Sequence, residues 1–132
     1  MTDHLPPIVV SEGDYDTLSE LAERTERALP KVSGFLAAEL ARAKVVPASR
    51  VPTDVVRMGS RAAFRMEATG VEREVTLVYP AEADILQDRL SILTPVGTAL
   101  LGLAAGQSMS WSDRTGNRQR LTLRTVRASA AG

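Results

Sequence analysis

Residues 90–102 read Leu-Ser-Ile-Leu-Thr-Pro-Val-Gly-Thr-Ala-Leu-Leu-Gly, a short apolar strand that passes directly into a short helix. Thr94 is a suitable N-cap, and Pro95 suits the first helical position because an N–H there would have no helical partner. Gly102 can adopt the left-handed backbone that ends a helix. The stretch therefore predicts a helix of about two turns. Gly97 and Ala99 are small enough to let it lie close to a sheet.

The sequence around this helix alternates apolar and polar residues with the period of β-strands. We expect strands at residues 55–58, 61–67, 72–79, 90–93, 107–111 and 119–127, with turns at 68–70 and 114–117. The apolar positions of these strands would face one side and cover the helix. Residues 51–132 are thus predicted to form an antiparallel β-sheet domain with one short helix, and the chain as a whole an α+β fold.

Residues 1–50 have a helical rather than a strand period. Ser11 is a plausible N-cap, and apolar residues follow it at helical spacing until Pro30, which cannot continue that helix. Ser33 is expected to cap a second helix, which ends before Pro47. We predict a short antiparallel helical hairpin, or coiled coil, with helices of roughly 24 Å and 18 Å. This arm would occupy residues 1–50.

Composition excludes several kinds of chemistry. The chain has 132 residues, 16 basic and 16 acidic, with a single His and no Cys, so thiolate nucleophiles, disulfides and Cys-based zinc sites are ruled out. His4 lies in what reads as a tail, a poor place for a catalytic relay. No apolar run approaches the roughly 20 residues that cross a bilayer. No secretory signal is visible, so we expect a cytoplasmic protein with no membrane partner.

Charge is divided between the two parts of the chain. Five basic and eight acidic residues lie before Val46, whereas eleven basic and eight acidic residues lie from Val46 onward. The opposite signs indicate two surfaces of different character. Neither part is basic enough to predict DNA binding from counterion release alone.

Residues 90–102, followed by Ala105-Gly106-Gln107, resemble the signature of the C-terminal domain of GreA/GreB transcription elongation factors. The Rnk family (regulators of nucleoside diphosphate kinase) is more similar still, in the segments 38–43, 54–58, 60–64 and 77–80. The likeness covers about residues 8–127. It implies an FKBP-like sheet domain with an N-terminal helical arm. It also implies docking on RNA polymerase at the rim of the secondary channel.

The resemblance also bears on catalysis. In Gre factors a long coiled coil enters the channel, and paired carboxylates at its tip help to hold a second Mg²⁺ for transcript cleavage. The arm here is much shorter, and its tip residues cannot be matched to that acidic tip: Glu23, Glu26, Arg27 and Lys31. We therefore expect a docked but inert competitor, which is not an enzyme and has no catalytic residue, metal or cofactor of its own.

The same resemblance implies a docking surface on the short helix. Its residues would be Ser91, Pro95, Val96, Gly97, Leu100 and Leu101. Because the small sheet needs a cover, we expect at least two of the four larger apolar side chains to be buried, Leu100 first. Ser91 and Gly97 follow from the signature and are also explained by a structural role.

Two other functions stay open. An FKBP-like fold suggests peptidyl-prolyl isomerisation, which needs an aromatic pocket, but two of the five aromatic residues lie in the hairpin. Nucleic-acid binding would use Arg118, Arg120 and Arg124, of which the last two share one strand face. No aromatic residue accompanies these arginines for base stacking, and we expect no sequence-specific DNA binding.

Overall fold

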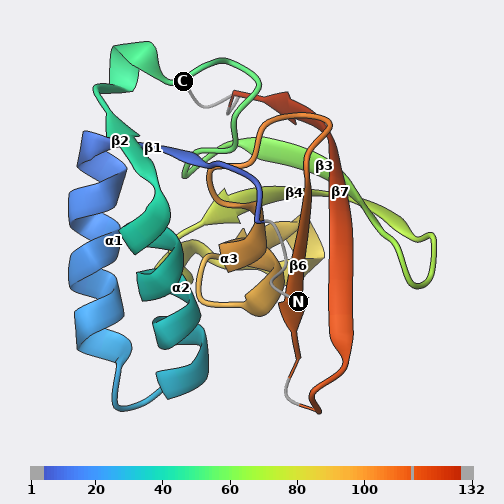
Figure 1. Ribbon diagram of the computed structural model, residues 1–132, viewed down its shortest axis with the longest axis horizontal. Coiled ribbons are helices and arrows are strands. Elements are labelled where there is room, and N and C mark those ends of the chain that lie inside the picture. The colour runs from blue at the N-terminus through green and yellow to red at the C-terminus, as the bar shows by residue number, and fades with distance from the viewer. Residues whose placement is uncertain (1–4, 114, 129–132) are drawn as a thin grey trace.

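Two antiparallel helices lie beside a curled sheet, with a third, short helix between them (Figure 1). The computed structural model describes residues 5–113 and 115–128. Three short 3₁₀ turns occupy Ala48–Arg50, Pro80–Glu82 and Ile85–Gln87. The elements in chain order are β1 (Val9–Ser11), α1 (Glu12–Thr25), α2 (Pro30–Arg42), β2 (Lys44–Val46), β3 (Arg61–Met66), β4 (Glu72–Val78), β5 (Arg89–Ser91), α3 (Pro95–Leu100), β6 (Ser108–Ser112) and β7 (Arg118–Arg127).

The start of the helical arm follows the prediction. The Ser11 hydroxyl accepts a hydrogen bond from the Asp14 N–H at 3.2 Å, which satisfies one of the unpaired donors of α1. The predicted cap at Ser33 is wrong, because Pro30 already occupies the first turn of α2 and Leu29 is its N-cap. Ser33 instead lies buried inside α2 and donates to the Ala22 carbonyl of α1 at 2.5 Å. This bond joins the two helices near the tip of the arm.

The five-stranded sheet has the order β5-β4-β3-β7-β6. Three of its four strand pairings are antiparallel, but β5 pairs parallel to β4, so the sheet is mixed rather than antiparallel. The cause is the connection through the turns at 80–87, which carries the chain back before β5 begins. The remaining predicted strand, residues 55–58, is wrong. Val55 makes one isolated bridge to Ala104, and this apolar run is buried by loop contacts instead.

A two-stranded parallel sheet, which the sequence analysis did not predict, closes the base of the arm. β1 pairs with β2, so the segments that enter and leave the hairpin lie side by side. The Val9 N–H also donates to the carbonyl of Gly102, just after α3, at 3.2 Å. The N-terminal strand therefore connects the arm to the end of the short helix.

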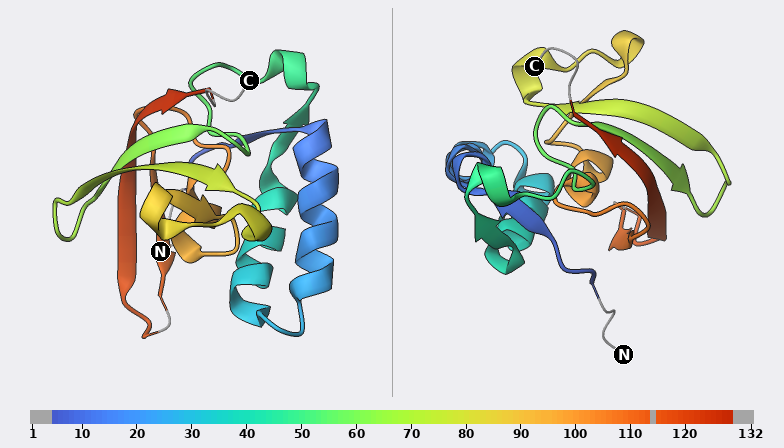
Figure 2. Two further views of the ribbon diagram at one scale, coloured as in Figure 1. Left: turned by 180° about the vertical axis from the view of Figure 1, so that it is seen from behind. Right: turned by 90° about the horizontal axis from the view of Figure 1, so that it is seen from above.

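One hydrophobic core is shared by the arm and the sheet. The helices lie on the inner side of the curled sheet (Figure 2). No helix among the described residues is long and apolar enough to span a bilayer. The largest fully buried side chains come from every part of the fold: Ile8, Leu18, Leu36, Phe64, Leu77, Ile92, Leu100, Leu101, Leu103, Met109, Leu121 and Leu123.

Candidate functional site

A hollow of about 610 Å³ opens between the tip of the arm and the sheet domain, which we call the head. We name this hollow the arm–head groove. One wall is the turn between α1 and α2 with the first turn of α2, and the other is formed by the start of α3 and the end of β6. The groove is lined by Ala28, Leu29, Pro30, Lys31, Val32, Phe35, Leu93, Pro95, Trp111, Ser112 and Asp113.

The lining of the groove is mainly apolar. Leu29 is 44% exposed, because it stands at the N-cap of α2, where the chain turns away from the arm core. Phe35 is half-buried on the facing side of α2, and Trp111 is buried on the inward face of β6. Accessible apolar and aromatic side chains around a few polar groups are typical of a binding site. This site was not predicted from the sequence, because Phe35 and Trp111 lie in separate parts of the chain.

Two charged residues line the groove, but one is committed to the fold. Asp113 Oδ1 accepts from the Thr115 hydroxyl at 2.6 Å, and its Oδ2 accepts from Gln119 Nε2 at 2.9 Å. These hydrogen bonds, with further ones from the N–H groups of Thr115 and Asn117, lower the pKa of Asp113 to about 2. Lys31 is exposed and forms no ion pair within residues 5–113 and 115–128. Of the two charged side chains that line the groove, Asp113 is thus an ionised carboxylate held by hydrogen bonds, and Lys31 is the one without a partner in the described chain.

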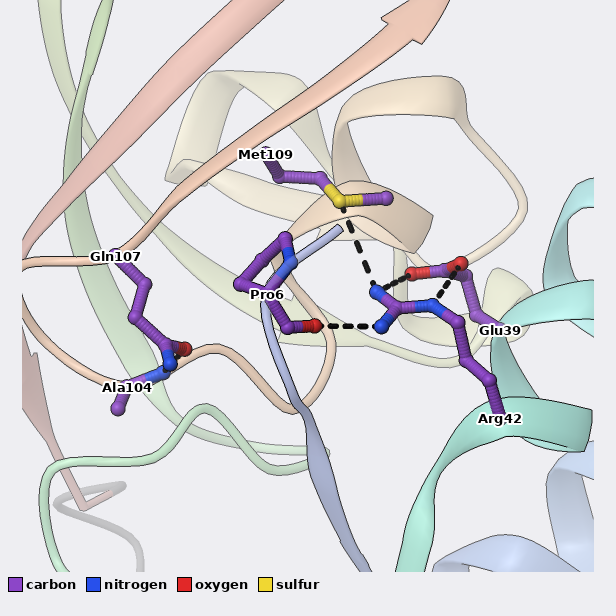
Figure 3. Close-up of polar contacts among 6 residues, drawn as sticks. All are labelled: Pro6, Glu39, Arg42, Ala104, Gln107 and Met109. Atoms are coloured by element: carbon purple, nitrogen blue, oxygen red, sulfur yellow. Dashed lines mark hydrogen bonds and ion pairs between the residues drawn. The ribbon is translucent and has the colours of Figure 1, made fainter. Parts of the chain in front are cut away.

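The base of the arm is fixed to the head by Arg42 (Figure 3). Its guanidinium donates to both carboxylate oxygens of Glu39, at 2.7 and 2.8 Å, and Glu39 is only 2% exposed. The same group donates to the Pro6 carbonyl at 2.5 Å and lies 3.8 Å from the Met109 sulfur on β6. Arg42 thus joins α2, the N-terminal segment and the sheet.

The six residues that were expected to dock on RNA polymerase do not form one exposed surface. Pro95 is exposed and lines the arm–head groove, and Val96 is half-buried. Leu100 and Leu101 are buried in the core, which confirms that at least two of the four apolar side chains face inward. Their side chains are therefore not available to a partner.

Ser91 and Gly97 hold the turn into α3. The Thr94 hydroxyl donates to the Ser91 carbonyl at 2.8 Å and accepts from the Gly97 N–H at 3.0 Å. A Cβ on Gly97 would stand 2.2 Å from that same carbonyl oxygen, so no larger residue fits. The Ser91 hydroxyl accepts from the Leu93 N–H at 3.0 Å, so both positions have a structural role.

The arm-tip residues are all exposed but do not form one cluster. Lys31 belongs to the arm–head groove, whereas Glu23 and Glu26 line a hollow of about 400 Å³ between α1 and α2. Arg27 lines neither hollow. In the part of the chain that the structure describes, no group of His, Cys, Asp or Glu side chains is arranged to hold a metal ion.

A third hollow, of about 200 Å³, lies beside the start of α3 and is lined by residues that include Ser91 and Thr94. Beside it stand Ile85 and Leu86, which are 73% and 92% exposed. Their turn is held by the Asp84 carboxylate, which accepts from the Leu86 N–H at 3.1 Å. This exposed apolar pair was not predicted from the sequence. The sequence feature that could have revealed it is two adjacent apolar residues near Asp84 and Asp88, in a segment with neither a strand nor a helix pattern.

Comparisons with known proteins agree with this architecture. Residues 51–127 match the family model "Transcription elongation factor, GreA/GreB, C-term", and residues 6–46 match "Rnk N-terminus". The Regulator of nucleoside diphosphate kinase of Escherichia coli (strain K12) is 40% identical over 106 residues, which are 80% of this chain and 78% of that protein. Transcription elongation factor GreA of Chloroflexus aggregans is 35% identical over 94 residues, which cover 71% of this chain but 57% of that factor.

A solved structure supports the same assignment over nearly the whole chain. "Prokaryotic transcription elongation factor GreA/GreB from Nitrosomonas europaea" matches with a TM-score of 0.72 and 40% identity, covering 92% of this chain and 98% of that one. The family models together span the arm and the head. The chain therefore belongs to the GreA/GreB family of transcription elongation factors, with an N-terminal segment of the Rnk type.

Proposed function

We propose that the protein is a transcription regulator that binds RNA polymerase near the secondary channel and does not stimulate transcript cleavage. The observation that carries the proposal is the arm–head groove, which brings Lys31 of the arm tip and Pro95 of α3 to one hollow. Pro95 belongs to the short helix that the family resemblance assigns to docking, and Lys31 belongs to the tip of the arm. In this proposal a segment of the polymerase binds in the groove and not on the face of α3 alone.

The chemistry of the groove defines what it would hold. Leu29 and Phe35 offer apolar area that loses water when a partner side chain enters. Lys31 stands at the rim with no carboxylate of its own among the described residues, so a partner segment with apolar side chains and an acidic residue fits best. Aromatic anchors in a groove with a charge at the rim are typical of protein–protein interfaces.

The absence of cleavage activity is proposed from the reach and charge of the arm. α1 has 14 residues. At 1.5 Å per residue such a helix extends about 21 Å. The turn that follows it carries Glu26 beside Arg27, not a pair of adjacent carboxylates. An arm of this kind would occupy the channel mouth, in the cytoplasm where polymerase works, without delivering a second Mg²⁺.

Site-specific photocrosslinking tests the docking. A photoreactive amino acid replaces Leu29 in the full chain, and a matched control replaces Val71, which is 51% exposed in the β3–β4 turn, outside the groove. With core RNA polymerase, we expect crosslinks from position 29 and few from position 71. Equal crosslinking from both positions, or none from position 29 at micromolar protein and low salt, would contradict the proposal.

Peptidyl-prolyl isomerisation is a second candidate, supported by one observation. Phe35 and Trp111 line the same groove, which gives the chain the paired aromatic side chains that a proline pocket needs. Measurable acceleration of proline isomerisation in a model peptide, lost in Trp111→Ala but retained in Val71→Ala, would favour this function over polymerase docking.

A further inference from the structure

The outer face of the five-stranded sheet is rich in arginine. On β3 and β7 the inward positions hold apolar residues such as Phe64 and Leu121, so the alternate positions face outward. The helices all lie on the opposite, inner side (Figure 2). Six arginines occupy or reach this outer face, namely Arg61, Arg65, Arg118, Arg120, Arg124 and Arg127.

Fewer carboxylates share the face than arginines. Glu74 pairs with both Arg61 and Arg127, the latter at 2.8 Å, and the two guanidinium groups lower the pKa of Glu74. Glu72 pairs with Arg124 at 3.2 Å, across the bulge that displaces Arg124 from the β7 register. The carboxylate of Glu67 accepts a hydrogen bond from the Thr122 hydroxyl at 2.8 Å. Among the described residues, six arginines and these three carboxylates share the face, which therefore has a local positive excess.

Hydroxyl groups lie beside the arginines. Ser108, Ser110 and Ser112 of β6 stand opposite Thr122, Arg120 and Arg118 of β7. Arg120 donates to the Ser110 hydroxyl at 3.4 Å and, like Arg65, has no carboxylate partner in residues 5–113 and 115–128. Guanidinium and hydroxyl donors are the groups that contact phosphate in protein–nucleic acid interfaces, and Arg does so bidentately.

We propose that this outer sheet face binds the phosphate backbone of nucleic acid without reading its sequence. The exposed ion pairs on the face are weak, so their guanidinium groups can exchange a carboxylate for a phosphate at little cost. Trp111 and Phe64 face inward, and no aromatic ring from the sheet strands stands among the outward arginines for base stacking. The site is separate from the arm–head groove, so a polymerase-bound molecule would still present it to nearby nucleic acid.

Fluorescence anisotropy with labelled homopolymeric single-stranded RNA and a DNA duplex tests the site, using the full chain across a range of salt. In Arg65→Gln/Arg120→Gln we expect the slope of log affinity against log salt to become shallower by about 1.4–1.8, the loss of two phosphate contacts. The control, Arg24→Gln/Arg27→Gln, removes the same charge from exposed positions of the arm and should leave the slope unchanged. Comparing the affinity for the single-stranded RNA with that for the DNA duplex shows which of the two nucleic acids the face binds more tightly.

Three results would overturn the proposal. The first is that the wild-type chain binds neither polymer at low salt, and the second is that the two double variants lose affinity equally. The third is that the Arg65→Gln/Arg120→Gln chain loses crosslinking to polymerase from position 29 but keeps its affinity for both polymers. That last result would assign the face to a protein partner, whereas failure of the position 29 crosslink in the wild-type chain concerns only the docking proposal.

Discussion

Gly97 lies where β5 and α3 approach most closely, and it shows how one residue sets the position of the candidate site. Its missing side chain lets the Ser91 carbonyl and the Thr94 hydroxyl meet over the first turn of α3. This contact sets where Pro95 enters the arm–head groove. The geometry of the groove therefore depends on a residue that does not line it.

Replacing Gly97 by alanine should destabilise the fold, whereas the same replacement at Gly34 should stabilise it. Gly97→Ala puts a methyl group 2.2 Å from a backbone oxygen, so we expect a loss of about 3 kcal/mol in the free energy of unfolding. Gly34→Ala, in α2 with nothing within 4 Å of the new Cβ, should gain roughly 0.5–1 kcal/mol. Urea unfolding measures both. Equal and small effects would show that α3 does not pack against β5 as described.

Asp113 gives the fold a specific dependence on acid. Its pKa is lowered to about 2 by the side chains of Thr115 and Gln119, below the ordinary value of 3.8. A carboxylate with a lowered folded pKa contributes stability above its unfolded pKa and loses it as pH falls toward the folded pKa. Wild-type urea midpoints should therefore fall more steeply than those of Asp113→Asn between about pH 4 and pH 2. Parallel curves for the two proteins would contradict the hydrogen bonds to this carboxylate.

At the scale of elements, two of the three predicted helix caps were correct, whereas the parallel strand pairings were not predicted. Ser11 and Thr94 marked the helix starts correctly because a cap is decided within three residues. Residues 55–58 had a strand pattern, but Val55 and Val56 are buried by a loop. The β1–β2 pair was missed because three-residue parallel strands separated by a hairpin leave little local signal.

Glu39 and Arg42 form an ion pair within α2, and the effects of replacing them should not be independent. Arg42→Met leaves the Glu39 carboxylate buried without its charged donor, so we expect a loss of about 3 kcal/mol in the free energy of unfolding. The double variant Glu39→Leu/Arg42→Met removes both charges and should recover most of that loss. Thermal or urea unfolding provides the comparison. A double variant as unstable as the single one would mean that the Pro6 contact, not the ion pair, carries the effect.

At the scale of the whole molecule, the arm–head groove is the feature that could not be predicted from the sequence. The resemblance identified the Pro95 region and the arm tip separately, but only the packing of the arm on the head brings Pro95 and Lys31 to one hollow. A division into an arm of residues 1–50 and a head of 51–132 stays a prediction. Because Leu36 and Leu100 belong to one core, we expect the two parts to unfold together.

Polymerase affinity should depend on the groove and not on exposed apolar residues in general. Leu29→Asp places a charge on the apolar wall, and we expect the affinity for core polymerase to fall about tenfold or more. Val71→Asp makes the same change at a similarly exposed position outside the groove and should bind as the wild type does. Equal affinities for both variants would place the docking surface elsewhere, with Ile85 and Leu86 the next residues to change.

The most direct test of the central claim is a transcript-cleavage assay in a stalled elongation complex supplied with a GreA factor. Titrating in the full chain should suppress the GreA-stimulated cleavage without cleaving the transcript itself, and Leu29→Asp should require a higher concentration for the same effect. Cleavage by the chain alone would contradict an arm that stops short of the metal centre. Undiminished GreA-stimulated cleavage at saturating chain would contradict docking at the shared site.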